Sequence, residues 1–415
     1  MFRIWHSTES FADYIIDHTD LKNKRILKKK IFESDANNSK YFHTMPDHIK
    51  KILYLDAPDL IVEYNTEPIF SIEISSEAGT GHNAFQRFAR LAASIENEVP
   101  ILYIYPEAVI IKRKNTPPRW DKINPLIFKA LDDAMTIYEI PVLLYYFPSD
   151  FKNFIDSPED SPNYRTKGLN YDSNIQAYSG CPNSEDAEMQ NVFATINQIL
   201  AVIEEHGIVD GRKKLNKNRT IMNRRNFINA EYSNKKGQRQ DTDMSPLSAT
   251  IKIDTSILIK YLSSKLIGHY EIGELLKSRK KTIIYKINAN FRGDPYPGAL
   301  AAIDYLSCRE GKTFEERRYN LVLAWGDVDI DNNLKTLKIT NSKNITIKDF
   351  VKDVKNIKNK MLLSKNFNEL KSHEIPRYYM QVRYGSMFSK VKHIRVYAYY
   401  ADAILFPDGF LWRDG

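Results

Sequence analysis

The chain contains 415 residues with a formal net charge of +8, and 42% of its residues are hydrophobic. This length exceeds what one ordinary hydrophobic core organises, so we expect two domains. The two cysteines, Cys181 and Cys308, exclude a disulfide framework and a cysteine-based zinc site. The positive charge suits a polyanion such as nucleic acid, although a soluble protein from a lysine-rich proteome has the same balance.

The N-terminal sequence MFRIWHSTESF lacks the uncharged apolar core of a signal peptide. No run reaches the roughly 18 apolar residues that cross a bilayer. The small number of cysteines fits a reducing compartment. We therefore expect a soluble, cytoplasmic protein that makes no membrane contact.

The first fifty residues are mixed and polar, and they include a basic cluster over 22–30. We interpret this cluster as the solvated face of a helix, which could also contact phosphate.

A clearer order of elements begins at residue 52. Asp59–Tyr64 is apolar in its middle and Pro68–Ser75 alternates apolar and polar residues, which predicts two strands joined by a tight turn. The later pattern predicts, in chain order, a helix over 82–96, a strand over 100–106, a helix over 121–138 and a strand over 141–147. This order implies an α/β (α+β) domain in which helices pack on a mixed sheet.

A helix is predicted over 185–206, and Gly207 is placed to end it. The segment 211–240 then carries ten Lys or Arg residues and one acid. It is either a flexible, self-repelling linker or a segment that lies along a phosphate backbone, and one segment can do both. Its candidate DNA contacts are Lys213, Lys214, Arg224 and Arg225. The expected divisions are a first domain over 1–210, this basic segment over 211–249 and a second domain over 250–415.

The second domain is predicted to be α+β and to supply DNA recognition or an accessory function. Its expected elements are helices over 255–276 and 349–363, strands over 320–325 and 393–405, and a terminal hairpin turning at Asp408–Gly409.

The most distinctive stretch of the second domain is NANFRGDPYPGALAAIDYL, in which two prolines stiffen a turn before a helix. It is either an ordered loop that caps the helix or a loop in which Arg292 contacts guanine edges or phosphates.

Asp59 and Glu73 lie on the two strands of the predicted hairpin. Hydrolysis of a phosphodiester bond needs a divalent cation, and Mg²⁺ prefers a few hard oxygen ligands. The two carboxylates, with the carbonyl of Ile74, offer such ligands. The alternative is an exposed hairpin with ordinary acids, which is how we interpret Glu63 and Glu67. The apolar strand and the helix that follows favour the metal site.

The sequence Pro58-Asp59, thirteen residues and then Glu73-Ile74-Ser75 resembles the motif of the PD-(D/E)xK nucleases. The element order over 52–147 is similar to the αβββαβ core of that superfamily. The stretch GHNAFQRFARLAASIENEVPILYIYPE resembles the helix and strand that follow the metal site in type II restriction endonucleases. The resemblance implies a restriction-endonuclease-like mixed sheet flanked by helices.

Ser75 stands where the motif has a lysine. Some members of the superfamily place another polar residue there. Ser75 could hold a water molecule, and Glu77 lies on the same side if the strand continues. The resemblance implies a catalytic set of Asp59, Glu73, Ser75, Glu77 and Gln86. If the site is active, catalysis either proceeds without a lysine at this position or borrows a charge from the next helix or strand.

His82, Gln86 and Arg90 share one stripe of the predicted helix, and Arg87 lies beside it. The resemblance implies that this helix lines the site. Gln86 then belongs to the catalytic set, and His82, Arg87 and Arg90 are candidate DNA contacts.

The resemblance implies a prokaryotic restriction-type enzyme that cleaves double-stranded DNA at a specific sequence with Mg²⁺, or with Mn²⁺ as a substitute. Cleavage of a palindromic site favours a homodimer. One alternative is another nuclease of this superfamily, acting in repair, at junctions or in phage defence. The other is a catalytically silent DNA-binding protein that keeps the fold, an alternative that the missing lysine favours.

Overall fold

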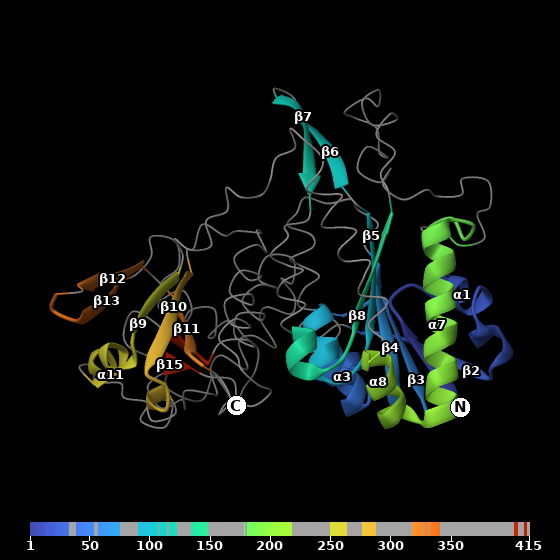
Figure 1. Cartoon of the computed structure of the whole chain (residues 1–415), viewed down its shortest axis with the longest axis horizontal. Coiled ribbons are helices and arrows are strands. Elements are labelled where there is room, and N and C mark those ends of the chain that lie inside the picture. Colours follow the sequence, from blue (N-terminus) through green and yellow to red (C-terminus); the bar gives the residue numbers. More distant parts are fainter. Residues whose placement is uncertain are drawn as a thin grey trace. The chain divides into compact units, whose positions relative to one another are not determined.

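Figure 1 shows the computed structural model of the chain. It describes residues 1–32, 39–53, 57–74, 90–106, 108–113, 116–122, 134–147, 178, 181–217, 250–263, 276–287, 318–325, 327–331, 333–340, 402–405 and 411–412. The chain divides into two compact units. The first comprises Met1–Phe32 and Phe42–Asp243, and the second comprises Glu33–Tyr41 and Met244–Gly415.

A six-stranded mixed sheet forms the centre of the first unit, in the order β2-β1-β3-β4-β5-β8. The strand β4 runs parallel to β5 and β5 parallel to β8, whereas β3 is antiparallel to both β1 and β4. The strands are β1 Phe2–His6, β2 Ile26–Lys30, β3 Leu60–Tyr64, β4 Glu67–Ile74, β5 Ile101–Pro106 and β8 Val142–Phe147. The prediction of a mixed sheet is confirmed.

The predicted hairpin is present as β3 and β4. Asn65 and Thr66 connect the strands, and both have positive φ, at 49° and 70°. Two central residues with positive φ match the twist of the flanking strands, so this turn closes the hairpin tightly. The register shifts by one residue between Val62 and Glu63, so Leu60 lies opposite Ile72.

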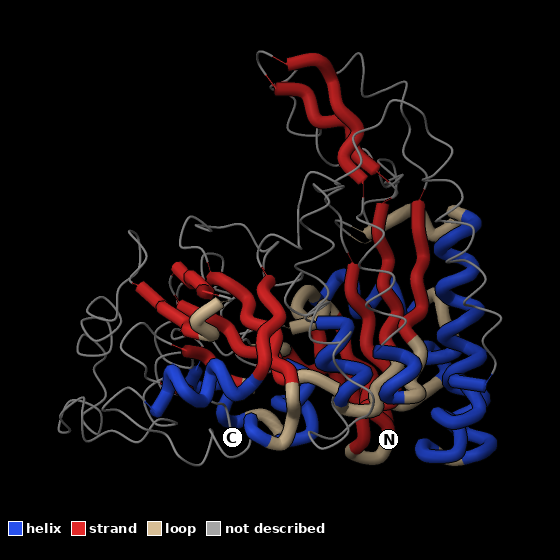
Figure 2. The backbone as a smooth tube through the Cα atoms, turned by 60° about the vertical axis from the view of Figure 1, so that its left-hand side comes forward, coloured by secondary structure: helices blue, strands red, loops and turns tan. Residues whose placement is uncertain are grey.

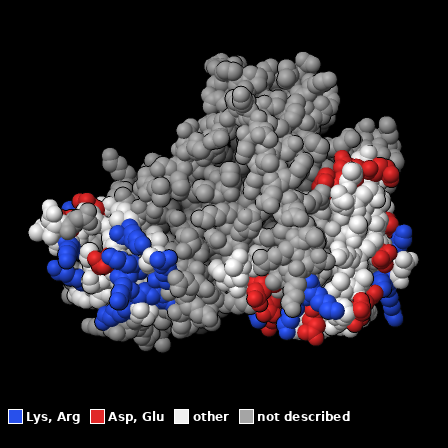
Figure 3. All heavy atoms as spheres, viewed as in Figure 1, with Lys and Arg blue, Asp and Glu red and all other residues white. Residues whose placement is uncertain are grey.

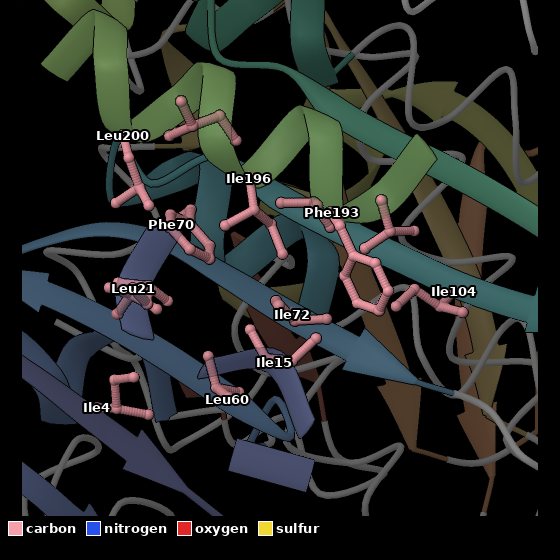
Figure 4. Close-up of a cluster of buried hydrophobic side chains, with 14 of the residues drawn as sticks. Ile4, Ile15, Leu21, Leu60, Phe70, Ile72, Ile104, Phe193, Ile196 and Leu200 are labelled. Atoms are coloured by element: carbon pink, nitrogen blue, oxygen red, sulfur yellow. The ribbon is translucent and has the colours of Figure 1, made fainter. Parts of the chain in front are cut away.

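Helices cover both faces of this sheet (Figure 2). Alternation along β3 and β4 directs Leu60, Phe70 and Ile72 to one face, where they pack against the helix α7, Ala187–His206. Figure 4 shows Phe193, Ile196 and Leu200 of α7 lying over these strand residues. The same core includes residues of α1, Glu9–Asp17, of the 3-10 turn η1, Asp20–Asn23, and of α8, Ile208–Lys217.

The opposite face of the sheet carries a second core, in which Trp5 and Ile61 pack with the helix α3, Asp47–Leu53. The short helix α2, Ser39–Thr44, precedes α3. Ser71 of β4 also faces this side, because its hydroxyl lies 2.9 Å from that of Ser94 in the helical segment 90–96. The sheet is therefore enclosed between helices, as the predicted α/β class requires.

The helix α7 agrees closely with its prediction. Asp186 caps its first turn by accepting a hydrogen bond from the backbone N–H of Glu188 at 2.9 Å. Gly207 ends the helix with φ 75° and ψ 173°, a backbone conformation that is essentially limited to glycine.

Replacing Gly207 by alanine should therefore destabilise the first unit. A Cβ added at this position would meet only open space, so the cost is backbone strain of about 1–3 kcal/mol. Urea unfolding measures the change in free energy. Gln198→Ala on the exposed face of α7 is the matched control and should stay within about 0.5 kcal/mol of wild type. Equal stability of the two variants would contradict the strain assigned to Gly207.

Two predictions for the first unit are wrong. The basic cluster does not form a helix face, because β2 contains Lys28–Lys30 and pairs with β1 as the edge strand of the sheet. Exposed lysines are typical of edge strands, where they oppose pairing with other chains. The predicted helix over 121–138 is also displaced, since the strand β7, Thr116–Lys122, pairs with β6, Ala108–Arg113. Helical structure is described only at 134–138.

A five-stranded sheet in the order β15-β14-β11-β10-β9 forms the second unit, together with a two-stranded sheet of β12 and β13. The elements are β9 Thr250–Asp254, α11 Thr255–Ser263, β10 Lys281–Ile287, β11 Asn320–Trp325, β12 Asp327–Asp331, β13 Thr336–Thr340, β14 Ala403–Leu405 and β15 Leu411–Trp412. The predicted strand at 320–325 and the terminal antiparallel hairpin are confirmed. The predicted helix at 349–363 lies outside the described residues.

Candidate active site

Three strand ends meet at one edge of the sheet in the first unit. β1 and β4 both run toward this edge and β3 starts from it, because β3 is antiparallel to its two neighbours. Leu60 lies opposite Ile72, and extending this register by one residue sets Asp59 opposite Glu73. Residues opposite each other in an antiparallel pair have Cβ atoms about 4.5–5.5 Å apart on the same face. This register sets the backbones of the two predicted metal ligands side by side at the sheet edge.

Asp59 is fixed in place by hydrogen bonds to both neighbouring strands. Its Oδ2 accepts the backbone N–H of Ile74 at 2.9 Å, and its Oδ1 accepts the hydroxyl of Ser7 at 3.1 Å. The backbone N–H of Ser7 also donates to the carbonyl of Asp59 at 2.9 Å. Asp59 is half-buried, so its carboxylate is positioned by the protein and is still accessible from the sheet edge.

Glu73 is fully buried, with a relative exposure of 0%, and Arg90 is 7% exposed. The Nη1 of Arg90 donates to the Oε1 of Glu73 at 2.6 Å. Arg90 and Ser94 are four residues apart on the helical segment 90–96 and so share a stripe. Arg90 contacts Glu73 and Ser94 contacts Ser71, and these two partners lie two residues apart on the same face of β4. Because both spacings keep residues on one face, the helix directs the guanidinium of Arg90 at the carboxylate of Glu73, a candidate metal ligand.

Three further side chains at this edge were not among the predicted site residues. Tyr103 of β5 lies beside Glu73 and is buried. His6 ends β1 opposite Leu60, and burial lowers its pKa more than the carboxylate of Glu9 raises it. Ser7 is the third addition, through its contacts with Asp59. Residues 6 and 7 lie far from Asp59 in sequence, so no local pattern reveals them.

The remaining predicted residues divide into two groups. Lys213 and Lys214 lie on α8: Lys213 is exposed and 3.7 Å from Asp210, and Lys214 lies 2.6 Å from the Nε2 of His206. The structure thus makes the start of the predicted basic linker part of a helix. The predicted residues outside the described ranges are Ser75, Glu77, His82, Gln86, Arg87, Arg224, Arg225 and Arg292.

Arg212, the residue before Lys213 on α8, has a different position. It is 9% exposed and donates to the backbone carbonyl of Pro68 at the start of β4. Burial lowers its pKa. Arg212 therefore anchors α8 to the sheet, and it is unsuited to a phosphate contact.

The interpretation of Glu63 as a surface acid is wrong. Glu63 is 1% exposed, and its carboxylate accepts hydrogen bonds from Arg3 and from the indole N–H of Trp5, the latter at 2.7 Å. The Nε2 of His48 lies 3.4 Å away. The strand β1 supplies two of these partners, so a hairpin pattern considered alone cannot reveal the burial.

The chemistry of Asp59 and Glu73 fits a hard divalent cation. A carboxylate offers about four lone-pair positions, so the two hydrogen bonds to Asp59 leave room for a metal contact. Mg²⁺ typically uses one or two carboxylates and keeps several water ligands. Within the described ranges, no cluster of three or more His, Cys, Asp or Glu side chains could hold a metal ion.

Comparison of the chain with protein-family models, curated proteins and solved structures found no match. None of the helices in the described part of the chain has the length and apolar character needed to cross a membrane.

Proposed function

We propose that the chain is a Mg²⁺-dependent endonuclease of the PD-(D/E)xK type that cleaves double-stranded DNA in the manner of restriction enzymes. The observation that carries the proposal is the β3–β4 register, which sets Asp59 opposite Glu73 at the end of a strand that runs parallel to β5. Ligands of open α/β sheets bind beyond the carboxyl ends of such strands. The resemblance of the sequence to the nuclease motif identifies the chemistry for which these two acids are suited.

Asp59 and Glu73 would hold the cation, with the carbonyl of Ile74 as a further oxygen. When bound, the ion would polarise the scissile phosphate and help to activate water. Hydrolysis adds one water molecule across a P–O bond and leaves a phosphate monoester and a hydroxyl group. The contribution of the chain is positional, because Ser7 and the backbone N–H of Ile74 orient Asp59 before substrate binds.

Arg90 supports the proposal at the point where the motif departs from its usual form. Ser75 brings no positive charge, whereas the guanidinium of Arg90 lies 2.6 Å from the Oε1 of Glu73. Arg90 would offset the charge of two adjacent carboxylates while the cation is absent. In this scheme the charge of the motif lysine comes from the helix after β4.

A second candidate function is a DNA-binding protein that keeps the fold without catalysis. The same Arg90–Glu73 pair is the observation that favours it. A buried arginine can neutralise a buried carboxylate permanently and so make a cation unnecessary.

Incubation of the full chain with supercoiled plasmids of different sequence separates these functions. The proposed enzyme should convert plasmids to discrete linear fragments in Mg²⁺ and leave them intact in EDTA. Random or structure-selective cutting would support another nuclease of the same superfamily. Binding without any cutting in Mg²⁺ or Mn²⁺ would overturn the enzyme proposal and support the silent DNA-binding protein.

A further inference from the structure

Basic side chains gather around one aromatic ring in the second unit, on the sheet face away from α11. Ile251 and Ile253 of β9 pack into the core that contains α11, so alternation directs Lys252 to the opposite face. The Nζ of Lys252 lies 3.9 Å from the centroid of the Tyr319 ring, and the Cζ of Arg318 lies 5.1 Å from it. Lys252 of β9 and Arg318, which lies just before β11, therefore place two cations at one ring.

Lys281 adds a third cation on this face. It begins β10 opposite Asp254, and the two side chains form an ion pair with an Nζ–Oδ1 distance of 2.7 Å. The Lys281 side chain is 44% exposed, and Lys252 and Arg318 are exposed. Figure 3 shows Lys and Arg gathered on the described surface of the second unit. Among the described residues named here, three cations accompany one acid.

Stabilisation of the fold alone is a weak explanation for this arrangement. An exposed cation–π contact is worth only about 0.5–1 kcal/mol, and two cations held at one ring repel each other. An anion placed beside the ring would be attracted by both cations. The ring of Tyr319 limits the positions of the two cations, so less of their freedom is lost when an anion binds.

We propose that Lys252, Lys281 and Arg318, arranged around Tyr319, form a surface that holds the phosphodiester backbone of double-stranded DNA. This inference rests on the proposed nuclease function and identifies residues of the second unit that would position the substrate. Phosphate contacts fix the register and orientation of a protein on DNA without reading its sequence. The surface therefore contributes affinity, and the choice of cleavage site belongs to other residues.

The test compares wild type with the Lys252→Ala/Arg318→Ala double variant in the full chain. Binding to short DNA duplexes of two unrelated sequences is followed by fluorescence anisotropy in EDTA, over about 50–200 mM salt. In a plot of the logarithm of the binding constant against the logarithm of the salt concentration, the slope should become shallower by about one unit for each cation removed. The affinity of the variant should fall equally for both sequences. Lys260→Ala, an exposed change on α11, is the matched control and should keep the wild-type slope.

Thermal melting accompanies each binding curve. If the double variant melts earlier than wild type, Lys252→Arg/Arg318→Lys, which keeps both charges, is used as well and should restore the slope. An unchanged slope in the alanine variant while wild type still cleaves DNA would overturn this surface and leave the nuclease proposal standing. Failure of wild type to bind either duplex would overturn both. Loss of slope without any cleavage by wild type would support the surface and overturn the nuclease proposal alone.

Discussion

Asp59→Asn should lower the rate of Mg²⁺-dependent DNA cleavage by about 10³-fold, because a catalytic cation supplies several kcal/mol of charge stabilisation and this variant removes one of its charged ligands. The fold should be kept. The amide oxygen can still accept the N–H of Ile74, and the amide nitrogen can donate to the hydroxyl of Ser7, where Asp59 now accepts. Initial rates of plasmid cleavage at saturating Mg²⁺ measure the loss.

Glu67→Gln is the matched control for this variant. Glu67 is an exposed acid on the same hairpin, at the opposite end of β4 from Glu73, so its loss of charge should leave the cleavage rate unchanged. Urea unfolding of both variants should give wild-type stability within about 0.5 kcal/mol. Wild-type cleavage by Asp59→Asn would contradict the assignment of the site.

Arg90→Met should destabilise the first unit by about 3–5 kcal/mol, since removing one member of a buried ion pair leaves the charge of the other uncompensated. Both members are buried here, with exposures of 0% for Glu73 and 7% for Arg90. This loss is a large fraction of the stability of an ordinary domain. Urea unfolding followed by a probe confined to the first unit measures it.

The Glu73→Met/Arg90→Met double variant completes this test. Replacing a buried pair by apolar residues of similar volume is often neutral, so the double variant should recover most of the stability that Arg90→Met loses. It should also be inactive, because it lacks Glu73. If the free-energy loss of the double variant equals the sum of the losses of the two single variants, the two residues are not coupled.

The elements that sequence analysis predicts correctly are those whose signals are local. The β3–β4 hairpin follows from alternation on either side of a short turn, and α7 follows from its apolar period and Gly207. Each of these signals lies within the element itself or in the residues that flank it. The edge strand β2 is the contrasting case, because its lysines resemble a solvated helix until its pairing with β1 is known.

The candidate site shows the same limit. Asp59 and Glu73 can both be named from the sequence, but their pairing also depends on a register shift between Val62 and Glu63 that the short turn does not reveal. Ser7 lies 52 residues from Asp59, and its role depends on the packing of β1 beside β3. The helical stripe predicts that Arg90 lines the site, but it cannot show that the guanidinium contacts Glu73. That contact depends on where the helix lies on the sheet.

The central claim is that Asp59 and Glu73 form a cation site at the sheet edge. Binding of Mn²⁺, followed by the electron paramagnetic resonance signal of the free ion in the presence of a short DNA duplex, tests it most directly. Wild type should take up Mn²⁺, and Asp59→Asn should bind it at least about tenfold more weakly. Equal Mn²⁺ uptake by the two proteins, or none by wild type, would contradict the claim.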